Sequence, residues 1–157
     1  MKHTLFYSFA IVAIGFLLYL NFRPSEKQKK EQDLLFSLQV PKPIGPSSQV
    51  VRKGNCFFVS GQFGIDVKNG KLDSSDISTE TKFALENIKN ILAQAHLSMD
   101  DIASATFYLT DMNDFERVND VYSKYFVTKN FPALSTVEVY ALPRNAHIEI
   151  SVIAVKE

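Results

Sequence analysis

The sequence has very few of the residues from which disulfides and metal sites are built. Cys56 is its only cysteine, which excludes a disulfide within the chain and a cysteine-rich metal site. The three histidines, His3, His96 and His147, stand far apart and form none of the usual metal-binding spacings. We therefore expect no metal, we expect each histidine at the surface or in an interface, and we interpret Cys56 as a small buried hydrophobe in a strand.

An excess of positive charge is also absent. The 17 basic residues are balanced by 17 acidic ones, so the formal net charge is zero. Electrostatic binding of nucleic acid needs an uncompensated basic face, and no nucleic-acid partner is expected. Apolar residues make up 46% of the chain, with thirteen Phe. This composition supports one core of roughly 110 to 120 residues, and it leaves room for one domain and a tail.

Only one long apolar run is present, near the N-terminus. Residues 5–22 (LFYSFAIVAIGFLLYLNF) contain 18 positions without a charge, the lower limit for a helix that spans a bilayer. A cleaved signal peptide would show small residues after such a run, whereas this run continues into the bulky, charged sequence LNFRP. The sequence therefore predicts an uncleaved membrane anchor over residues 1–22. A cleaved signal and a misassigned start codon are the alternatives.

Residues 23–33 are polar and charged and predict a solvated linker. Lys2 precedes the apolar run, whereas four basic residues follow it closely: Arg23, Lys27, Lys29 and Lys30. The positive-inside rule favours a domain on the cytoplasmic side of the membrane. The very short N-terminal side keeps the reverse orientation open.

Residues 34–157 have the pattern of short strands and two amphipathic helices. A β-branched and aromatic run predicts a strand at 56–60, and Asn69-Gly70 predicts a tight turn. Several possible N-caps between Asp73 and Ser78 precede a helix. The apolar residues of that helix share one face: Ala84, Ile88, Ile91, Leu92 and Ala95.

The second half predicts a strand, a helix and two more strands. Ser98 and Asp101 have the spacing of a capping box. Apolar residues then alternate with polar ones, as in a half-buried strand: Ala103, Ala105, Phe107 and Leu109. Asn113 and Glu116 are spaced as at a helix start, and the helix that follows has one apolar face: Phe115, Val118, Tyr122, Tyr125 and Phe126.

Strands at 135–139 and 147–155 complete this pattern. The simplest architecture for it is an α+β fold, in which both helices pack on one face of a mixed sheet.

Six short strings in this domain occur in the order and spacing of a known family. They are IGP at 44–46, VSGQ at 59–62, ALENIK at 84–89, YLTDMNDF at 108–115 followed by VN at 118–119 and Tyr122, FPA at 131–133 with VEV at 137–139, and IEI at 148–150. Each string alone is a weak signal. Together they resemble the RidA family, the YjgF-type (RutC-like) reactive-intermediate deaminases, over nearly the whole domain.

The resemblance implies a chorismate-mutase-like α+β fold assembled as a homotrimer. Three clefts at the subunit interfaces would bind small carboxylates, without a metal or organic cofactor. Many members hydrolyse enamines and imines derived from 2-amino acids and release ammonia and a 2-oxo acid. A ribonuclease activity has been associated with some relatives, but the neutral charge of this chain argues against it.

One position departs from the family in a way that bears on the chemistry. The family's carboxylate-binding arginine follows Pro-Ala, whereas Leu134 follows Pro132-Ala133 here. A hydrogen bond to a charged group is worth about 1.5–3 kcal/mol, and about 1.36 kcal/mol is tenfold in rate. Losing a bidentate arginine should therefore weaken recognition of a carboxylate substrate by two or more orders of magnitude. Arg52 and Arg144 are candidates to compensate by residue type alone.

Two further differences affect the same cleft. Ser47 stands where the family commonly has a tyrosine that borders the cleft, and Glu80 replaces a common glutamine near the start of the first helix. A carboxylate at position 80 would repel a carboxylate ligand if it faced the cleft.

The remaining positions match the family, and we carry their roles over. Glu149 matches the catalytic glutamate that orients water, although a strand residue at an exposed alternate position would look the same. The candidate binding residues are Ser47, Ser60, Gly61, Asn119, Leu134 and Thr136.

We therefore expect a membrane-anchored, trimeric RidA-like protein with a small-molecule cleft. Its imine deaminase activity would be absent or altered. An active 2-iminobutanoate/2-iminopropanoate deaminase is the alternative.

Overall fold

The computed structural model describes residues 33–35, 40–73, 75–128 and 130–157, and residues Gln32–Glu157 form one compact unit. The proposed membrane segment and all but the last residue of the linker lie outside the described residues. Among those that are described, no helix combines the length and the apolar character needed to cross a bilayer.

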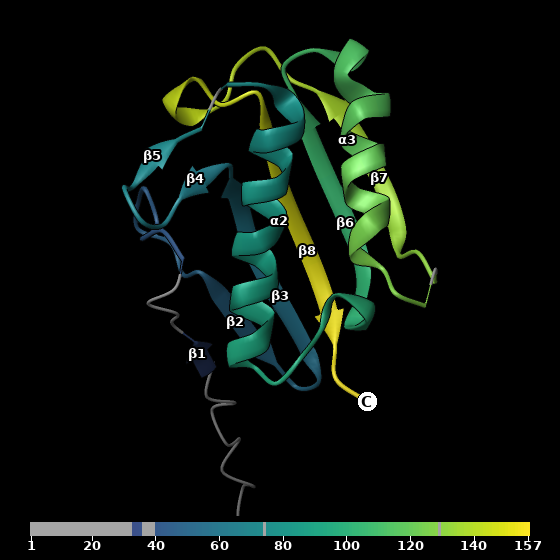
Figure 1. The fold of residues 1–157 in the computed structure, drawn as a ribbon. Helices are drawn as coiled ribbons and strands as arrows, with labels where there is room; N and C mark the ends of the chain where they lie inside the picture. Colours follow the sequence, from purple (N-terminus) through teal and green to yellow (C-terminus); the bar gives the residue numbers. More distant parts are fainter. Residues whose placement is uncertain (1–32, 36–39, 74, 129) are drawn as a thin grey trace, which may run out of the picture. The chain divides into compact units, whose positions relative to one another are not determined.

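A six-stranded mixed sheet with two helices on one face confirms the expected α+β fold (Figure 1). The strand order is β1-β2-β3-β8-β6-β7; β6 and β7 are parallel and the other neighbours are antiparallel. The strands are β1 (Asp33–Leu35), β2 (Val50–Lys53), β3 (Cys56–Phe63), β6 (Ile102–Leu109), β7 (Ala133–Glu138) and β8 (Ile148–Val155).

Helices α2 (Ile77–Gln94) and α3 (Phe115–Tyr122) lie side by side over the sheet (Figure 1). A small hairpin, β4 (Ile65–Asp66) and β5 (Lys71–Leu72), follows β3, and the expected Asn69-Gly70 turn joins its strands. Short 3₁₀ turns occur at Met99–Asp101, Met112–Asp114, Ser123–Tyr125 and Pro143–Asn145.

The core lies between the helices and the sheet, because alternate strand residues and one stripe of each helix are apolar. Phe107 of β6 is fully buried and packs edge-to-face on Tyr122 of α3, with ring centroids 4.9 Å apart. The predicted stripe of α2 is buried throughout: Ala84, Ile88, Ile91, Leu92 and Ala95. β8 adds its inward residues Ile148, Ile150, Val152 and Ala154.

Two predicted strands differ from the observed ones, and in each the strand register shifts. Ala103 was expected on the buried face, but it is exposed, because the register shifts between Ile102 and Ser104 and Ile102 takes the inward position. β3 was expected to end at Ser60, but it continues to Phe63 beyond a shift between Val59 and Gln62. A β-bulge of this kind bends a strand and re-aims its side chains.

The helix starts were predicted in part. Among the candidate caps, Asp76 begins α2, and its Oδ1 accepts hydrogen bonds from the backbone N–H groups of Ser78 and Thr79. The capping box of Ser98 and Asp101 is confirmed, but it opens a 3₁₀ turn before β6.

The start of the second helix was predicted incorrectly. Asn113 does not cap it; the carboxylate of Asp111 accepts from the backbone N–H of Asn113, and α3 follows this turn. Phe115, expected on the buried face, is exposed because it is the first residue of α3 and precedes the turn that packs on the sheet.

The sheet face opposite the helices carries several exposed apolar side chains. Phe58 pairs with Ile153 across β3 and β8, and Val137 of β7 pairs with Tyr108 of β6. Phe58, Val137 and Ile153 are each more than a third exposed. Cys56 starts β3 on this face opposite Val155 and is only partly buried, which corrects its interpretation as a core residue.

Candidate functional site

Four of the predicted site residues meet at the bulge of β3. Ser47, Ser60, Gly61 and Glu149 line one hollow of about 310 Å³. They come from the loop before β2, from β3 and from β8. The walls are largely apolar and include three prolines, with Phe63 and Ile65 on the side of β3 and β4. The hollow therefore combines one carboxyl group with an apolar surface.

Gly61 is the reason that the Glu149 side chain can lie where it does. A Cβ added at position 61 would come within 1.6 Å of Glu149 Oε1 and 2.7 Å of its Cγ. The Glu149 side chain thus occupies the space that any other residue at position 61 would fill. The two candidate residues form one unit in which the glycine makes room for the carboxyl group.

Ser60 and Gln62 fix the backbone around this unit. Ser60 Oγ donates to the carbonyl of Ser48 at 2.7 Å, which ties β3 to the loop that carries Ser47. Buried Gln62 donates from Nε2 to the carbonyls of Ser60 and Gly61 at 2.9 and 3.2 Å. Gln62 is not among the predicted site residues, although it belongs to the VSGQ string.

Partial burial raises the pKa of Glu149 above its usual value. Its register partners, Phe63 on β3 and Tyr108 on β6, place it on the sheet face opposite the helices. A raised pKa makes a carboxyl group a better proton donor when it is protonated and a stronger base when it is ionised, as general acid–base catalysis requires. A protonated carboxyl also suits a neutral polar ligand, to which it can donate a hydrogen bond.

The other three candidate residues lie elsewhere in the chain. Asn119 belongs to α3, and Leu134 and Thr136 belong to β7 at the edge of the sheet. Leu134 pairs with Ala105 and Thr136 with Phe107, which places both side chains on the helix-covered face. Glu149 lies on the opposite face, so one chain does not bring the two sets of candidates together.

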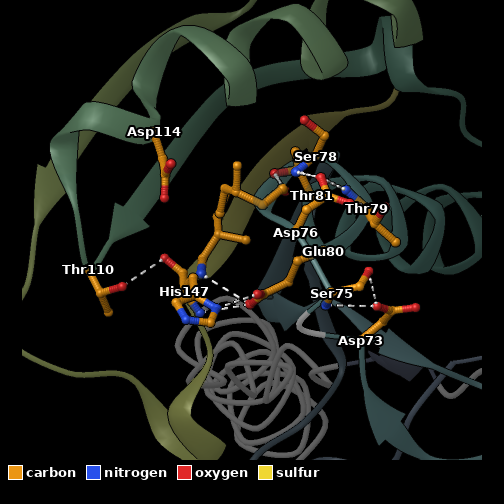
Figure 2. A network of polar contacts seen from close by, with 12 residues as sticks. Asp73, Ser75, Asp76, Ser78, Thr79, Glu80, Thr81, Thr110, Asp114 and His147 are labelled. Carbon is orange, nitrogen blue, oxygen red and sulfur yellow. Dashed lines mark hydrogen bonds and ion pairs between the residues drawn. The ribbon is translucent and has the colours of Figure 1, made fainter.

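Glu80 does not face the hollow, which removes the expected repulsion of a carboxylate ligand. Its side chain is fully buried, and Oε1 accepts from the backbone N–H groups of His147 at 2.8 Å and Ile148 at 3.2 Å. Oε2 lies 2.9 Å from Nδ1 of His147 (Figure 2). The carbonyl of His147 in turn accepts a hydrogen bond from the backbone N–H of Thr110 at 3.1 Å.

The hydrogen bonds from the backbone of His147 and Ile148 to Glu80 fix the start of β8, one residue before Glu149. The close approach of α2 that it needs depends on Gly64, because a Cβ there would meet the backbone carbonyl oxygen of Glu80 at 2.5 Å. A second buried polar side chain of α2, that of Asn87, fixes the backbone of Phe63 and Ile65, which line the hollow beside Glu149. Asn87 Nδ2 donates to the carbonyls of Phe63 and Ile65 at 3.1 and 3.0 Å.

Neither arginine considered for compensation lines the hollow. Arg52 Nε donates to the carbonyl of Gly54 in the β2–β3 turn. Arg144 lines a neighbouring hollow, whereas Lys42 lines both. Across the described part of the chain, no group of three or more potential metal ligands is close enough to hold an ion.

Comparison with known proteins identifies the family. A family model described as Endoribonuclease L-PSP matches residues 37–156. A RutC family protein of Pyrococcus horikoshii is 46% identical over 126 residues, which are 80% of this chain and 99% of that protein. The chain belongs to the RidA/YjgF family.

Two further relatives connect the family with an activity and with a solved structure. The 2-iminobutanoate/2-iminopropanoate deaminase of Bos taurus is 40% identical over 123 residues, which are 78% of this chain and 89% of that enzyme. The crystal structure of Escherichia coli TdcF with bound serine has a TM-score of 0.76 at 35% identity, and the match covers 80% of this chain and 99% of TdcF. The RidA fold predicted from the sequence strings is thereby confirmed.

Replacing Glu80 tests its role in holding β8. Glu80→Ala leaves two buried N–H groups without an acceptor, which costs about 1–3 kcal/mol each, so the free energy of unfolding should fall by about 2–6 kcal/mol. Glu80→Gln keeps one carbonyl acceptor and should lose less than half of that. Urea unfolding followed by circular dichroism measures both. Glu116→Ala, at an exposed glutamate, serves as control and should stay within about 0.5 kcal/mol of wild type. An equally small effect of Glu80→Ala would contradict the role.

The raised pKa of Glu149 predicts how stability depends on pH. A carboxyl group whose pKa is higher in the folded than in the unfolded state stabilises the fold fully below its unfolded pKa of about 4.3, and this contribution is lost as the pH rises through the folded pKa. Glu149→Gln removes the charge. The variant should therefore gain stability relative to wild type as the pH rises from about 4.3 through the folded pKa of Glu149. Urea unfolding across that range tests this, and a difference that does not change with pH would contradict it.

Proposed function

We propose that this RidA-family protein binds a small molecule in a cleft between subunits and hydrolyses short 2-imino acids poorly or not at all. The observation that carries this proposal is Leu134. It stands on β7 at the position of the family's carboxylate-binding arginine, 38% exposed, and it has no hydrogen-bond donor. Ser60, Gly61 and Glu149 still match the family strings, and the walls of the hollow around them are mainly apolar.

The separation of the candidate residues supports a cleft between subunits. Asn119, Leu134 and Thr136 lie on the α3 and β7 side, away from the hollow of Glu149. A complete site therefore needs the β7 side of one copy to meet the hollow of another. The apolar side chains on the sheet face opposite the helices supply a surface through which copies can associate.

An active imine deaminase is the second candidate. It is favoured by the raised pKa of Glu149, which suits proton transfer, and by the similarity to the bovine deaminase. The two candidates differ in whether wild type releases ammonia without the arginine.

The N-terminal anchor remains part of the proposal. It is supported by the 18 uncharged residues of the apolar run at 5–22, which is long enough for one span. The basic residues after the run favour the cytoplasmic side for the domain.

Ammonia release from freshly generated 2-iminopropionate tests the function. We expect Leu134→Arg to raise the rate at least about a hundredfold over wild type, since a bidentate arginine adds two charge-assisted hydrogen bonds. Leu134→Lys should gain less, because lysine lacks the fork. Adding Glu149→Ala to Leu134→Arg should abolish the gain. If wild type is already active and loses activity with Glu149→Ala, the deaminase candidate is correct.

The assembly and the anchor are tested together with two lengths of the chain. Residues 32–157, which form the compact unit, should run as a trimer in light scattering and stay in the supernatant. The full chain should sediment with membranes and resist extraction by alkaline carbonate. A monomer would overturn the interface cleft, and a full chain in the supernatant would overturn the anchor.

A further inference from the structure

A second hollow adjoins the one that holds Glu149. It has about the same volume, 310 Å³, and shares Pro41, Lys42 and Ile65 with the first. Its remaining lining residues are Val40, Val67, Gly70 and Arg144. Two cationic side chains and several apolar ones therefore line this hollow, and no carboxylate does.

A tight turn holds Arg144 at this place. The backbone N–H of Ala146 donates to the carbonyl of Pro143 at 3.2 Å, and the two central residues, Arg144 and Asn145, have φ of +60° and +57°. A long side chain rarely adopts this left-handed conformation, and such residues tend to be retained at functional sites. Pro143 lines the first hollow and Arg144 the second, so consecutive residues of the turn border both.

The charge of the two cations is not neutralised within the described part of the chain. Neither Lys42 nor Arg144 forms a hydrogen bond or ion pair with another residue there. Asp66 lies in sequence between two lining residues, Ile65 and Val67. Its two oxygens accept from the backbone N–H of Lys68 and from Asn69 Nδ2 in the β4–β5 turn. The second hollow is thus a cationic region beside an apolar cleft.

We propose that Lys42 and Arg144 form an anion subsite, which holds the carboxylate of a small apolar organic acid whose body lies in the hollow beside Glu149. This inference rests on the proposed function, because it takes the Glu149 hollow to be the binding cleft, and it names the class of ligand. The subsite adjoins the Glu149 hollow, whereas Leu134 lies on β7 at the edge of the sheet. A carboxylate with an apolar body can extend from this subsite into the hollow beside Glu149, because the two hollows share Pro41, Lys42 and Ile65.

Binding of hexanoate to the full chain in detergent, measured by isothermal titration calorimetry, tests the subsite. Hexanamide, which has the same body without the charge, should bind at least about fivefold more weakly than hexanoate. Lys42→Gln and Arg144→Asn should each weaken hexanoate binding at least about tenfold, as expected for the loss of one charge-assisted contact, and should leave hexanamide unchanged. Asparagine tolerates the left-handed conformation of residue 144, so this variant keeps the turn.

The controls separate this subsite from general effects of charge. Lys53→Gln, at an exposed lysine at the end of β2, should leave hexanoate binding unchanged, and added salt should weaken binding in wild type more than in the two variants. Hexanoate binding that is undetectable in wild type, or unaffected by Lys42→Gln and Arg144→Asn, would overturn the subsite. Equal binding of hexanoate and inorganic phosphate would overturn the choice of a carboxylate. None of these outcomes depends on ammonia release, so the proposed function stands or falls separately.

Discussion

A fully buried carboxylate, that of Glu80, fixes the strand on which the candidate catalytic residue lies. A carboxyl group buried in an apolar core is costly unless hydrogen bonds satisfy it. Here two backbone N–H groups donate to Oε1, and Nδ1 of His147 lies within hydrogen-bond distance of Oε2. Those donors belong to His147 and Ile148, directly before Glu149. The cost of burying Glu80 is therefore offset only when β8 starts at one position, and this couples the helix to the geometry of the cleft.

Asn87 makes the same kind of connection about two turns further along α2. Its amide satisfies two carbonyls at the end of β3 and the start of β4, where regular strand pairing stops. Gly64 lies between those carbonyls and lets the helix approach. The apolar stripe of α2 holds the helix on the sheet, while two of its buried polar side chains, Glu80 and Asn87, determine where the walls of the hollow stand.

The parts of the fold that were predicted correctly are those with local causes. The alternation of Ala105, Phe107 and Leu109 and the stripe of Ile88 and Leu92 follow from the periods of strand and helix, and all five are buried. The bulge at Ser60 and Gly61 has no such cause, since it depends on how β3 pairs with β8. The string VSGQ suggested Ser60 and Gly61 as candidate site residues through its family resemblance, and not through any period in the sequence.

The role of Glu80 could not be read from the sequence for a related reason. Its partner His147 is 67 positions away, and a glutamate in the first turn of a helix is usually a solvated residue that favours the helix dipole. Position alone suggested a cleft residue. Only the packing of α2 against the start of β8 shows that the carboxylate acts on the backbone instead.

The electrostatics of the cleft link Glu149 to any ligand that carries charge. Burial already favours the protonated carboxyl, and an anion bound in the same cleft would favour it further, because two like charges in a region of low dielectric constant repel each other. Cations at Lys42 and Arg144 act in the opposite sense by neutralising the ligand. By linkage, a ligand that raises the pKa of Glu149 must itself bind more tightly when Glu149 is protonated. In the proposed cleft between subunits Leu134 would add no charge, so the balance between binding of the ligand and protonation of Glu149 would depend on Lys42 and Arg144.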